Sequence, residues 1–194
     1  MSEHLTPDKI LVCAPNWIGD AVMCTPALQG IRLAFSSSEI ILLARPLVAN
    51  LLKAHSCIDR IIEYEHQGKH SGLFGKWRLS RTLQSLDCEV GVLFPNSFDA
   101  ALVAFLARIP RRFGYATDGR SLLLTDAVGL PPKARQVHQV KYYEEFIRSI
   151  CPTYSSTPPA LSVSIDDEAR ANNCLLYTSP SPRDRGSSRM PSSA

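Results

Sequence analysis

A short loop near the start of the chain, APNWIGD from Ala14 to Asp20, carries the residues best suited to chemistry. Gly19 would let a ligand approach the backbone closely, because glycine has no side chain. Asp20 would lie in the first turn of a following helix, where exposed amides and the helix dipole favour an ionised carboxylate. Such a carboxylate can take a proton from a hydroxyl group as a general base. The same carboxylate could instead cap the helix, and local chemistry leaves both roles open.

Other polar residues could bind a substrate. Asn96 and Ser97 follow a short apolar run, and they could hydrogen-bond sugar hydroxyls or cap the next helix. Trp17 could stack on a sugar ring or pack against its own helix. Basic side chains that could hold a carboxylate or phosphate are Lys69, Lys76, Arg78, Arg111, Arg112 and Arg120. His138 and Lys141, at the start of the last helix, suit either a binding site or an exposed surface.

The elements that must position these residues alternate along the chain. Aliphatic runs predict strands over 9–14, 39–44, 58–64, 89–94 and 112–115, with a further extended piece at 121–124. Apolar residues at helical spacing predict helices over 18–35, 46–54, 76–86, 98–107 and 136–150, and a polar loop spans 66–75. This alternation predicts an α/β fold, a Rossmann-like parallel sheet with helices on both faces. Ligands of such sheets bind outside the carboxyl ends of the strands, so Asn16 and its neighbours occupy the expected position.

Composition excludes several classes of protein. Of the net charge of +3, most falls in the last residues, because residues 1–173 hold 18 basic and 17 acidic side chains. A nearly neutral body argues against a nucleic-acid partner. None of the six cysteines forms a CxxC pair, so we expect reduced thiols and no metal site. The chain has no dinucleotide or P-loop glycine motif, no secretory signal and no transmembrane segment, which predicts a cytoplasmic protein.

Several collinear segments resemble the ADP-heptose:lipopolysaccharide heptosyltransferases of glycosyltransferase family nine. The resemblance begins with ILVCAPNWIGDAVMCTPAL, which matches the strand, turn and helix that open these enzymes. It continues with LFPNSFDAAL after the fourth expected strand, with ARIPRRFGYATDGRSLLL around the fifth, and with HQVKY before the last helix. The Asn16-Trp17 pair favours type II over type I of the family.

The resemblance implies the acceptor-side, N-terminal half of a two-domain GT-B enzyme. Its reaction would transfer heptose from ADP-L-glycero-D-manno-heptose to the anionic lipopolysaccharide inner core, with inversion and without a metal or another cofactor. Asp20 matches the proposed catalytic base. The substrate-binding residues implied by the matching segments are Asn16, Trp17, Gly19, Asn96, Ser97, Arg112, Arg120, His138 and Lys141. The enzyme would be cytoplasmic, or peripheral at the inner face of the inner membrane.

The end of the chain departs from the family. We expect an acceptor-side domain over 1–165, the start of an interrupted helix over 166–173, and a non-native or disordered tail over 174–194, whose LLYTSPSPRDRG string resembles translated sequencing adapter. The family's donor-binding domain has no counterpart here, so we expect the polypeptide to be inactive alone. Two alternatives remain: a single-domain module that binds an anionic sugar or nucleotide without catalysis, and another family-nine transferase such as heptosyltransferase I.

Overall fold

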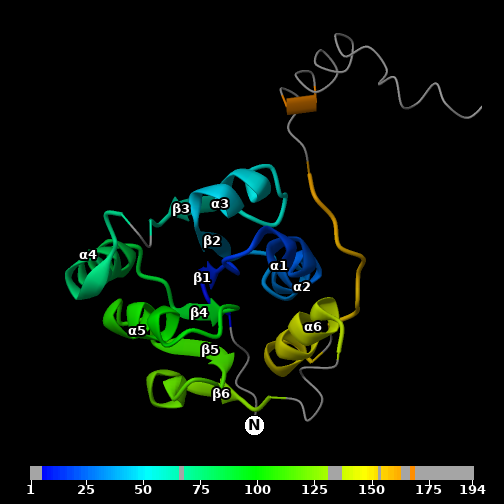
Figure 1. Cartoon of the computed structure of the whole chain (residues 1–194). Helices are drawn as coiled ribbons and strands as arrows, with labels where there is room; N and C mark the ends of the chain where they lie inside the picture. Colours follow the sequence, from blue (N-terminus) through cyan, green and yellow to red (C-terminus); the bar gives the residue numbers. More distant parts are fainter. Residues whose placement is uncertain (1–5, 66–67, 131–136, 153, 163–166, 169–194) are drawn as a thin grey trace, which may run out of the picture. The chain divides into compact units, whose positions relative to one another are not determined.

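The parallel sheet at the centre of the chain is confirmed by a computed structural model, which describes residues 6–65, 68–130, 137–152, 154–162 and 167–168. The chain divides into two compact units, Met1–Ser162 and Val163–Ala194, and every element below belongs to the first. The six strands run in the order β3-β2-β1-β4-β5-β6, and each pairs in parallel with its neighbour (Figure 1). Their bounds are Lys9–Cys13 for β1, Glu39–Ala44 for β2, Arg60–Glu63 for β3, Val90–Leu93 for β4, Arg111–Tyr115 for β5 and Asp126–Val128 for β6.

Helices cover both faces of this sheet, as the alternating pattern predicts. Successive strand residues point to opposite faces, so β1 contributes Ile10 and Val12 to one core and Leu11 and Cys13 to another. The first core holds side chains of α1 (Ile18–Met23), α2 (Thr25–Ala34), α3 (Pro46–Leu52) and α6 (Gln139–Ile150). The second holds side chains of α4 (Gly72–Gln84) and α5 (Phe98–Leu106), which lie on the opposite side of the sheet in Figure 1.

Three of the predicted elements are wrong in detail. The expected helix over 18–35 is two helices that meet at Cys24, because Pro26 in the first turn of α2 cannot continue the hydrogen-bond ladder of α1. Residues 121–123 are not extended: Arg120–Leu123 form a 3-10 helix, only Leu124 of the predicted piece has extended backbone, and the strand is β6, which follows and pairs with β5.

The third correction concerns α4, which begins at Gly72 inside the segment that we expect to be a loop. Gly75 is buried, and a Cβ atom there would lie 2.4 Å from the backbone carbon of His70. The glycine therefore allows the helix to pack directly against the turn that precedes it. Of the helix predicted over 166–173, Asp167 and Glu168 are described and are helical, while the predicted tail over 174–194 lies outside the described residues.

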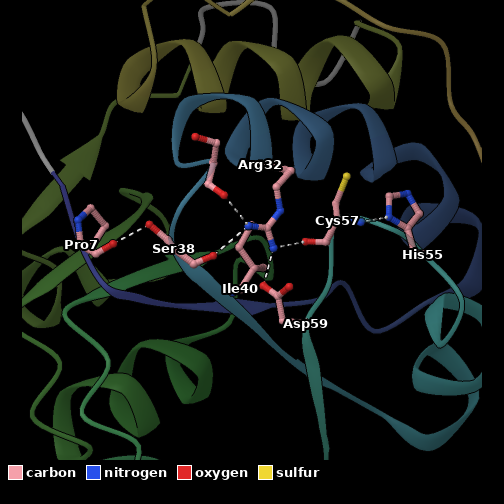
Figure 2. A network of polar contacts seen from close by, with 8 residues as sticks. Pro7, Arg32, Ser38, Ile40, His55, Cys57 and Asp59 are labelled. Carbon is pink, nitrogen blue, oxygen red and sulfur yellow. Dashed lines mark hydrogen bonds and ion pairs between the residues drawn. The ribbon is translucent and has the colours of Figure 1, made fainter.

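A network of polar contacts joins β2 and β3 at their amino ends (Figure 2). The guanidinium of Arg32, near the end of α2, donates to the carbonyls of Ser38 at 2.8 Å and Cys57 at 3.2 Å and forms an ion pair with Asp59. Asp59 in turn accepts a hydrogen bond of 2.7 Å from the backbone nitrogen of Ile40. This network lies at the edge of the sheet opposite to the carboxyl ends of the strands.

Candidate functional site

The loop after β1 lies where the sequence predicts, at the carboxyl end of the strand. The side-chain oxygen of Asn16 accepts a hydrogen bond of 2.8 Å from the hydroxyl of Tyr64, which follows β3. Trp17 is the N-cap residue of α1, and its side chain is largely exposed rather than packed. Gly19 is exposed too, and nothing lies within 4 Å of the place where a Cβ atom would be. The space beside Gly19 is therefore open to a ligand.

The carboxylate of Asp20 is half-buried in the first turn of α1. It has no hydrogen bond or ion pair with a residue that the structure describes, so it does not act as a hydrogen-bonding cap. The charge of Asp20 also acts on the neighbouring Cys24. Burial raises the pKa of the Cys24 thiol, and the negative charge of Asp20 raises this pKa further. The carboxylate oxygens of Asp20 are therefore available to accept a hydrogen bond from a ligand hydroxyl beside the loop.

The loop after β4 is held by hydrogen bonds of its own side chains, Asn96 and Ser97. The amide nitrogen of Asn96 donates to the hydroxyl of Tyr142 at 2.7 Å, and its amide oxygen accepts from Arg120 at 3.2 Å. The Ser97 hydroxyl accepts a bond of 3.3 Å from the backbone nitrogen of Ala100, so Ser97 caps α5. The amide of Asn96 is thus committed to the protein on both sides, while Ser97 still faces a cavity.

Arg120 orients the loop after β4 through hydrogen bonds to its backbone and to Asn96. Its side chain is 0% exposed, and burial lowers the pKa of its guanidinium. The guanidinium donates to the carbonyl of Tyr115 at 2.9 Å, to that of Pro95, and to the amide oxygen of Asn96. It therefore joins the carboxyl ends of β4 and β5, and it reaches a ligand only through the residues that it orients.

Arg112 is not brought together with the other predicted site residues. It is the second residue of β5, so it lies at the amino end of that strand, across the sheet from the loop after β1. Its guanidinium donates to the carbonyls of Ile109 and Leu123, the latter at 2.7 Å, and lies 5.5 Å from the ring centre of Phe105. These contacts give it a role in holding the turns around β5.

His138 and Lys141 lie at the start of α6. The Nδ1 atom of His138 accepts a bond of 3.3 Å from the backbone nitrogen of Val140, so the imidazole caps this helix, and Lys141 is exposed. Tyr142, the next residue, contacts Asn96, which links the start of α6 to the loop after β4. The first turn of α6 therefore lies at the same edge of the sheet as Asn96.

A cavity of about 100 Å³ lies between the carboxyl ends of the strands and the helices α4 and α5. Asn16, Lys76 and Ser97 line it, so the structure brings these three predicted residues together. Sequence reasoning missed four more polar lining residues, His70, Asp99, Arg45 and Tyr64, of which the last two have a shared signal. Each of these two directly follows a strand, so the rule that selects Asn16 would also have selected them.

The charge in this cavity is net positive. Lys76 forms an ion pair of 2.5 Å with Asp99, and burial lowers the pKa of His70, which favours its neutral form. Arg45 hydrogen-bonds Tyr64, but its Nε atom is buried and has no hydrogen-bond partner among the described residues. Arg45 lines the cavity, so the charge of its guanidinium would attract an anionic group there, whereas its Nε atom is too buried for a ligand to reach. Within the described parts of the chain, no group of three or more His, Cys, Asp or Glu could hold a metal ion, and no helix is long and apolar enough to span a membrane.

Comparison with known proteins finds sequence relatives of this chain. No protein-family model matches the chain. The lipooligosaccharide heptosyltransferase 2 of Haemophilus ducreyi is 31% identical over 122 residues, which are 61% of this chain and 34% of that protein. The lipopolysaccharide heptosyltransferase 2 of Escherichia coli is 27% identical over 184 residues, which are 90% of this chain and 52% of that protein. The resemblance to lipopolysaccharide heptosyltransferases is confirmed.

Solved structures of heptosyltransferases and their family share the fold. A glycosyl transferase family 9 protein from Veillonella parvula matches with a TM-score of 0.80 at 16% identity, over 90% of this chain and 52% of that one. The E. coli ADP-heptose lps heptosyltransferase II matches with a TM-score of 0.72 at 24% identity, over 88% of this chain and 51% of that one. The chain thus spans between about a third and a half of the length of the heptosyltransferases that it resembles.

Proposed function

We propose that this chain forms the acceptor-side part of an inverting, metal-independent heptosyltransferase. The enzyme would transfer heptose from ADP-L-glycero-D-manno-heptose to a heptose of the lipopolysaccharide inner core. The observation that carries the proposal is the similarity to lipopolysaccharide heptosyltransferases along 90% of the chain. The loop after β1 supports it, because a carboxylate without a partner and a position open to a ligand lie together there.

In this proposal Asp20 is the general base. An acceptor hydroxyl beside the loop after β1 would give its proton to the Asp20 carboxylate as its oxygen bonds to the anomeric carbon of the donor. The bond from that carbon to the diphosphate breaks, and ADP leaves with the electron pair. Attack from the face opposite to ADP inverts the anomeric centre. The substrate-facing residues in this scheme are Asn16, Trp17, Gly19, Asn96, Ser97, His138 and Lys141, with Arg120 orienting the loop after β4.

The proposed role of Asp20 predicts a large fall in kcat when its carboxylate becomes an amide. Replacement of Asp20 by Asn keeps the size of the side chain but removes its basicity, so we expect kcat to fall about a hundredfold to ten-thousandfold. The assay follows ADP release from ADP-heptose with an inner-core oligosaccharide ending in heptose, using the protein encoded by the full reading frame. The matched control is Asp8→Asn, an exposed carboxylate before β1, which should leave kcat unchanged. Full activity in Asp20→Asn would contradict the role of Asp20.

The chain by itself should bind the acceptor without releasing ADP, because it spans only about half of the E. coli heptosyltransferase. Release of ADP by the chain alone would contradict this expectation. Acceptor binding without ADP release, even by the complete reading frame, would instead favour a module that binds an anionic sugar without catalysis.

The cavity beside Asn16 suits an anionic group of the acceptor. Arg45 lines this cavity with its guanidinium, and Lys76 adds a second cation. We expect Arg45→Gln to weaken binding of the inner-core oligosaccharide about tenfold, as for the loss of one charge-assisted hydrogen bond. Isothermal titration of the chain measures this, with Arg60→Gln on the exposed edge strand as control. Equal loss in both variants would mean that general charge, not this cavity, binds the acceptor.

A further inference from the structure

The outward face of α4 carries large apolar side chains that the described parts of the chain leave exposed. Leu73 is 78% exposed, Phe74 77% and Trp77 51%. The opposite face of the same helix is buried through Gly75, Leu79 and Leu83. Because residues three and four apart share a face of a helix, the exposed side chains form one stripe that points away from the core. Figure 1 shows α4 at the outer side of the molecule, beyond α5.

The exposed aromatic residues form one surface rather than scattered contacts. The rings of Phe74 and Trp77 stack, with centres 5.8 Å apart. An open groove of about 430 Å³ continues from Trp77 to Phe105 and Leu106 at the end of α5, which are also partly exposed. Contiguous exposed apolar surface of this kind is unusual in the absence of a partner.

This surface is positively charged. The segment 69–84 contains Lys69, Lys76, Arg78 and Arg81 and no Asp or Glu. Arg78 and Arg81 are exposed on the same face as the aromatic stripe, and the guanidinium carbon of Arg81 lies 5.9 Å from the ring centre of Trp77. Arg108 lines the groove beside it. Within the part of the chain that the structure describes, Lys76 is the one of these cations that forms an ion pair with an acidic side chain.

We propose that the outward face of α4, together with the end of α5, docks on the surface of an anionic lipid bilayer. A helix with Trp, Phe and Leu beside Lys and Arg, and without acidic residues, has the character of a helix that lies in a membrane interface. The aromatic rings would enter the headgroup region, while the arginines bind lipid phosphates. Aromatic residues and arginine are enriched in protein interfaces too, so a protein partner is an outcome of the test; the bilayer is favoured because the segment 69–84 holds four cations and no carboxylate beside the exposed rings.

This docking surface rests on the proposed function and adds to it the membrane surface at which the reaction would occur. The inward side of α4 lines the cavity beside Asn16 through Lys76 and Leu79. A bilayer on the outward side would therefore hold the cavity close to the headgroups, where a lipid-linked acceptor is anchored. The inference itself needs no sugar transfer, so it can fail or succeed separately from the proposed function.

Vesicle sedimentation tests the surface directly. The chain should sediment with vesicles of three parts phosphatidylcholine and one part phosphatidylglycerol, far less with phosphatidylcholine alone, and less as salt screens the arginines. Phe74→Ser/Trp77→Ser and Arg78→Gln/Arg81→Gln should each lower the partition coefficient by at least roughly tenfold. The matched controls are Leu33→Ser/Leu122→Ser, which change equally exposed apolar residues elsewhere, and Arg60→Gln/Arg148→Gln. Circular dichroism establishes that each variant folds.

A second measurement locates the contact. The chain has two tryptophans, so Trp17→Phe leaves Trp77 as the single reporter. Its emission should shift to shorter wavelength on anionic vesicles, whereas Trp17 in Trp77→Phe should not shift. Equal binding to neutral vesicles, equal loss in the control variants, or no shift at Trp77 would overturn the proposal. Loss of self-association in Phe74→Ser/Trp77→Ser, without vesicle binding by the parent chain, would show that a second copy covers this face instead.

Discussion

Arg120 illustrates how one residue can serve a site that it does not touch. Its guanidinium donates hydrogen bonds to four acceptors, the carbonyls of Pro95, Ser97 and Tyr115 and the amide oxygen of Asn96. No acidic side chain among the described residues forms an ion pair with it, so these hydrogen bonds compensate much of its burial, and the charge of Asp118 adds a favourable interaction. Such a cation fixes the loop after β4, because any movement of the loop leaves buried polar atoms without partners.

Replacement of Arg120 by Met should lower the free energy of unfolding by about 3 kcal/mol, because the apolar side chain leaves buried carbonyl oxygens unsatisfied. Urea unfolding followed by circular dichroism measures the change. Arg60→Met, an exposed arginine on β3, serves as control and should shift the free energy by less than about 0.5 kcal/mol. A similar small shift in Arg120→Met would mean that the guanidinium contributes no net stability.

Sequence reasoning selected Arg120 and Arg112 together, and the structure separates them. Both match basic positions of a linear motif, but Arg112 is the second residue of a strand and Arg120 begins the 3-10 helix beyond its end. The strand therefore carries the two to opposite edges of the sheet. Counting from the start of the predicted strand would have separated them, whereas the burial of Arg120 depends on packing that no local pattern records.

At the scale of elements, Arg32 holds α2, β2 and β3 in register. It reaches the carbonyls of Ser38 and Cys57 and the carboxylate of Asp59, which also accepts from the backbone of Ile40 (Figure 2). Since β3 is an edge strand with only one neighbour, these contacts supply much of its attachment at the amino end. We therefore expect β3 to depend on Arg32 more than the central strands do.

Arg32→Met should lower the free energy of unfolding by about 2 kcal/mol, since hydrogen bonds to charged groups contribute about 1.5–3 kcal/mol each before solvent exposure reduces them. Hydrogen exchange should also show faster exchange of the β3 amides than of the β1 amides. A double-mutant cycle with Asp59→Asn isolates the ion pair. Uniform acceleration of exchange over the whole sheet would contradict a local role at β3.

Most elements are predictable from the sequence, and the exceptions have physical causes. Buried strands such as β1 and β2 can be recognised in the sequence as unbroken aliphatic runs. The break at Cys24 is missed because apolar spacing continues through it, although Pro26 signals it. β6 is missed because it has three residues and depends on pairing with β5. Lys76 is predicted as a cation for an anionic group, but its meeting with Arg45 and Tyr64 is missed because the three residues come together only when three elements pack.

At the scale of the whole molecule, folding buries cysteine thiols and tyrosine hydroxyls, which must stay protonated in the folded state. The five described cysteines are free and buried. Burial raises the pKa of Cys13 to about 12 and those of Cys88 and Cys151 to about 11, against an ordinary value of 9.0. Burial likewise raises the pKa values of Tyr115 and Tyr143. The two cores of the sheet therefore share one requirement, that these thiols and phenols remain neutral.

The sign of the pH dependence follows from linkage. Below the ordinary thiol pKa of 9.0, folded and unfolded chains both hold these protons, so the contribution of burial is fully present. Between that value and about 11 or 12 the unfolded chain loses protons that the folded chain keeps, so stability falls as pH rises. Each thiol can then contribute a loss approaching about 1.4 kcal/mol per pH unit.

We therefore expect the urea midpoint to be nearly constant from about pH 7 to 8 and to fall steeply above about pH 9. Cys88→Ala removes one titrating thiol at little cost in volume, so its midpoint should fall less steeply with pH than that of the parent chain. Ser85→Ala, an exposed change in the preceding turn, should leave the slope unaltered. A midpoint that does not change up to about pH 10 would mean that these thiols ionise equally in both states, and thus that water reaches the two cores.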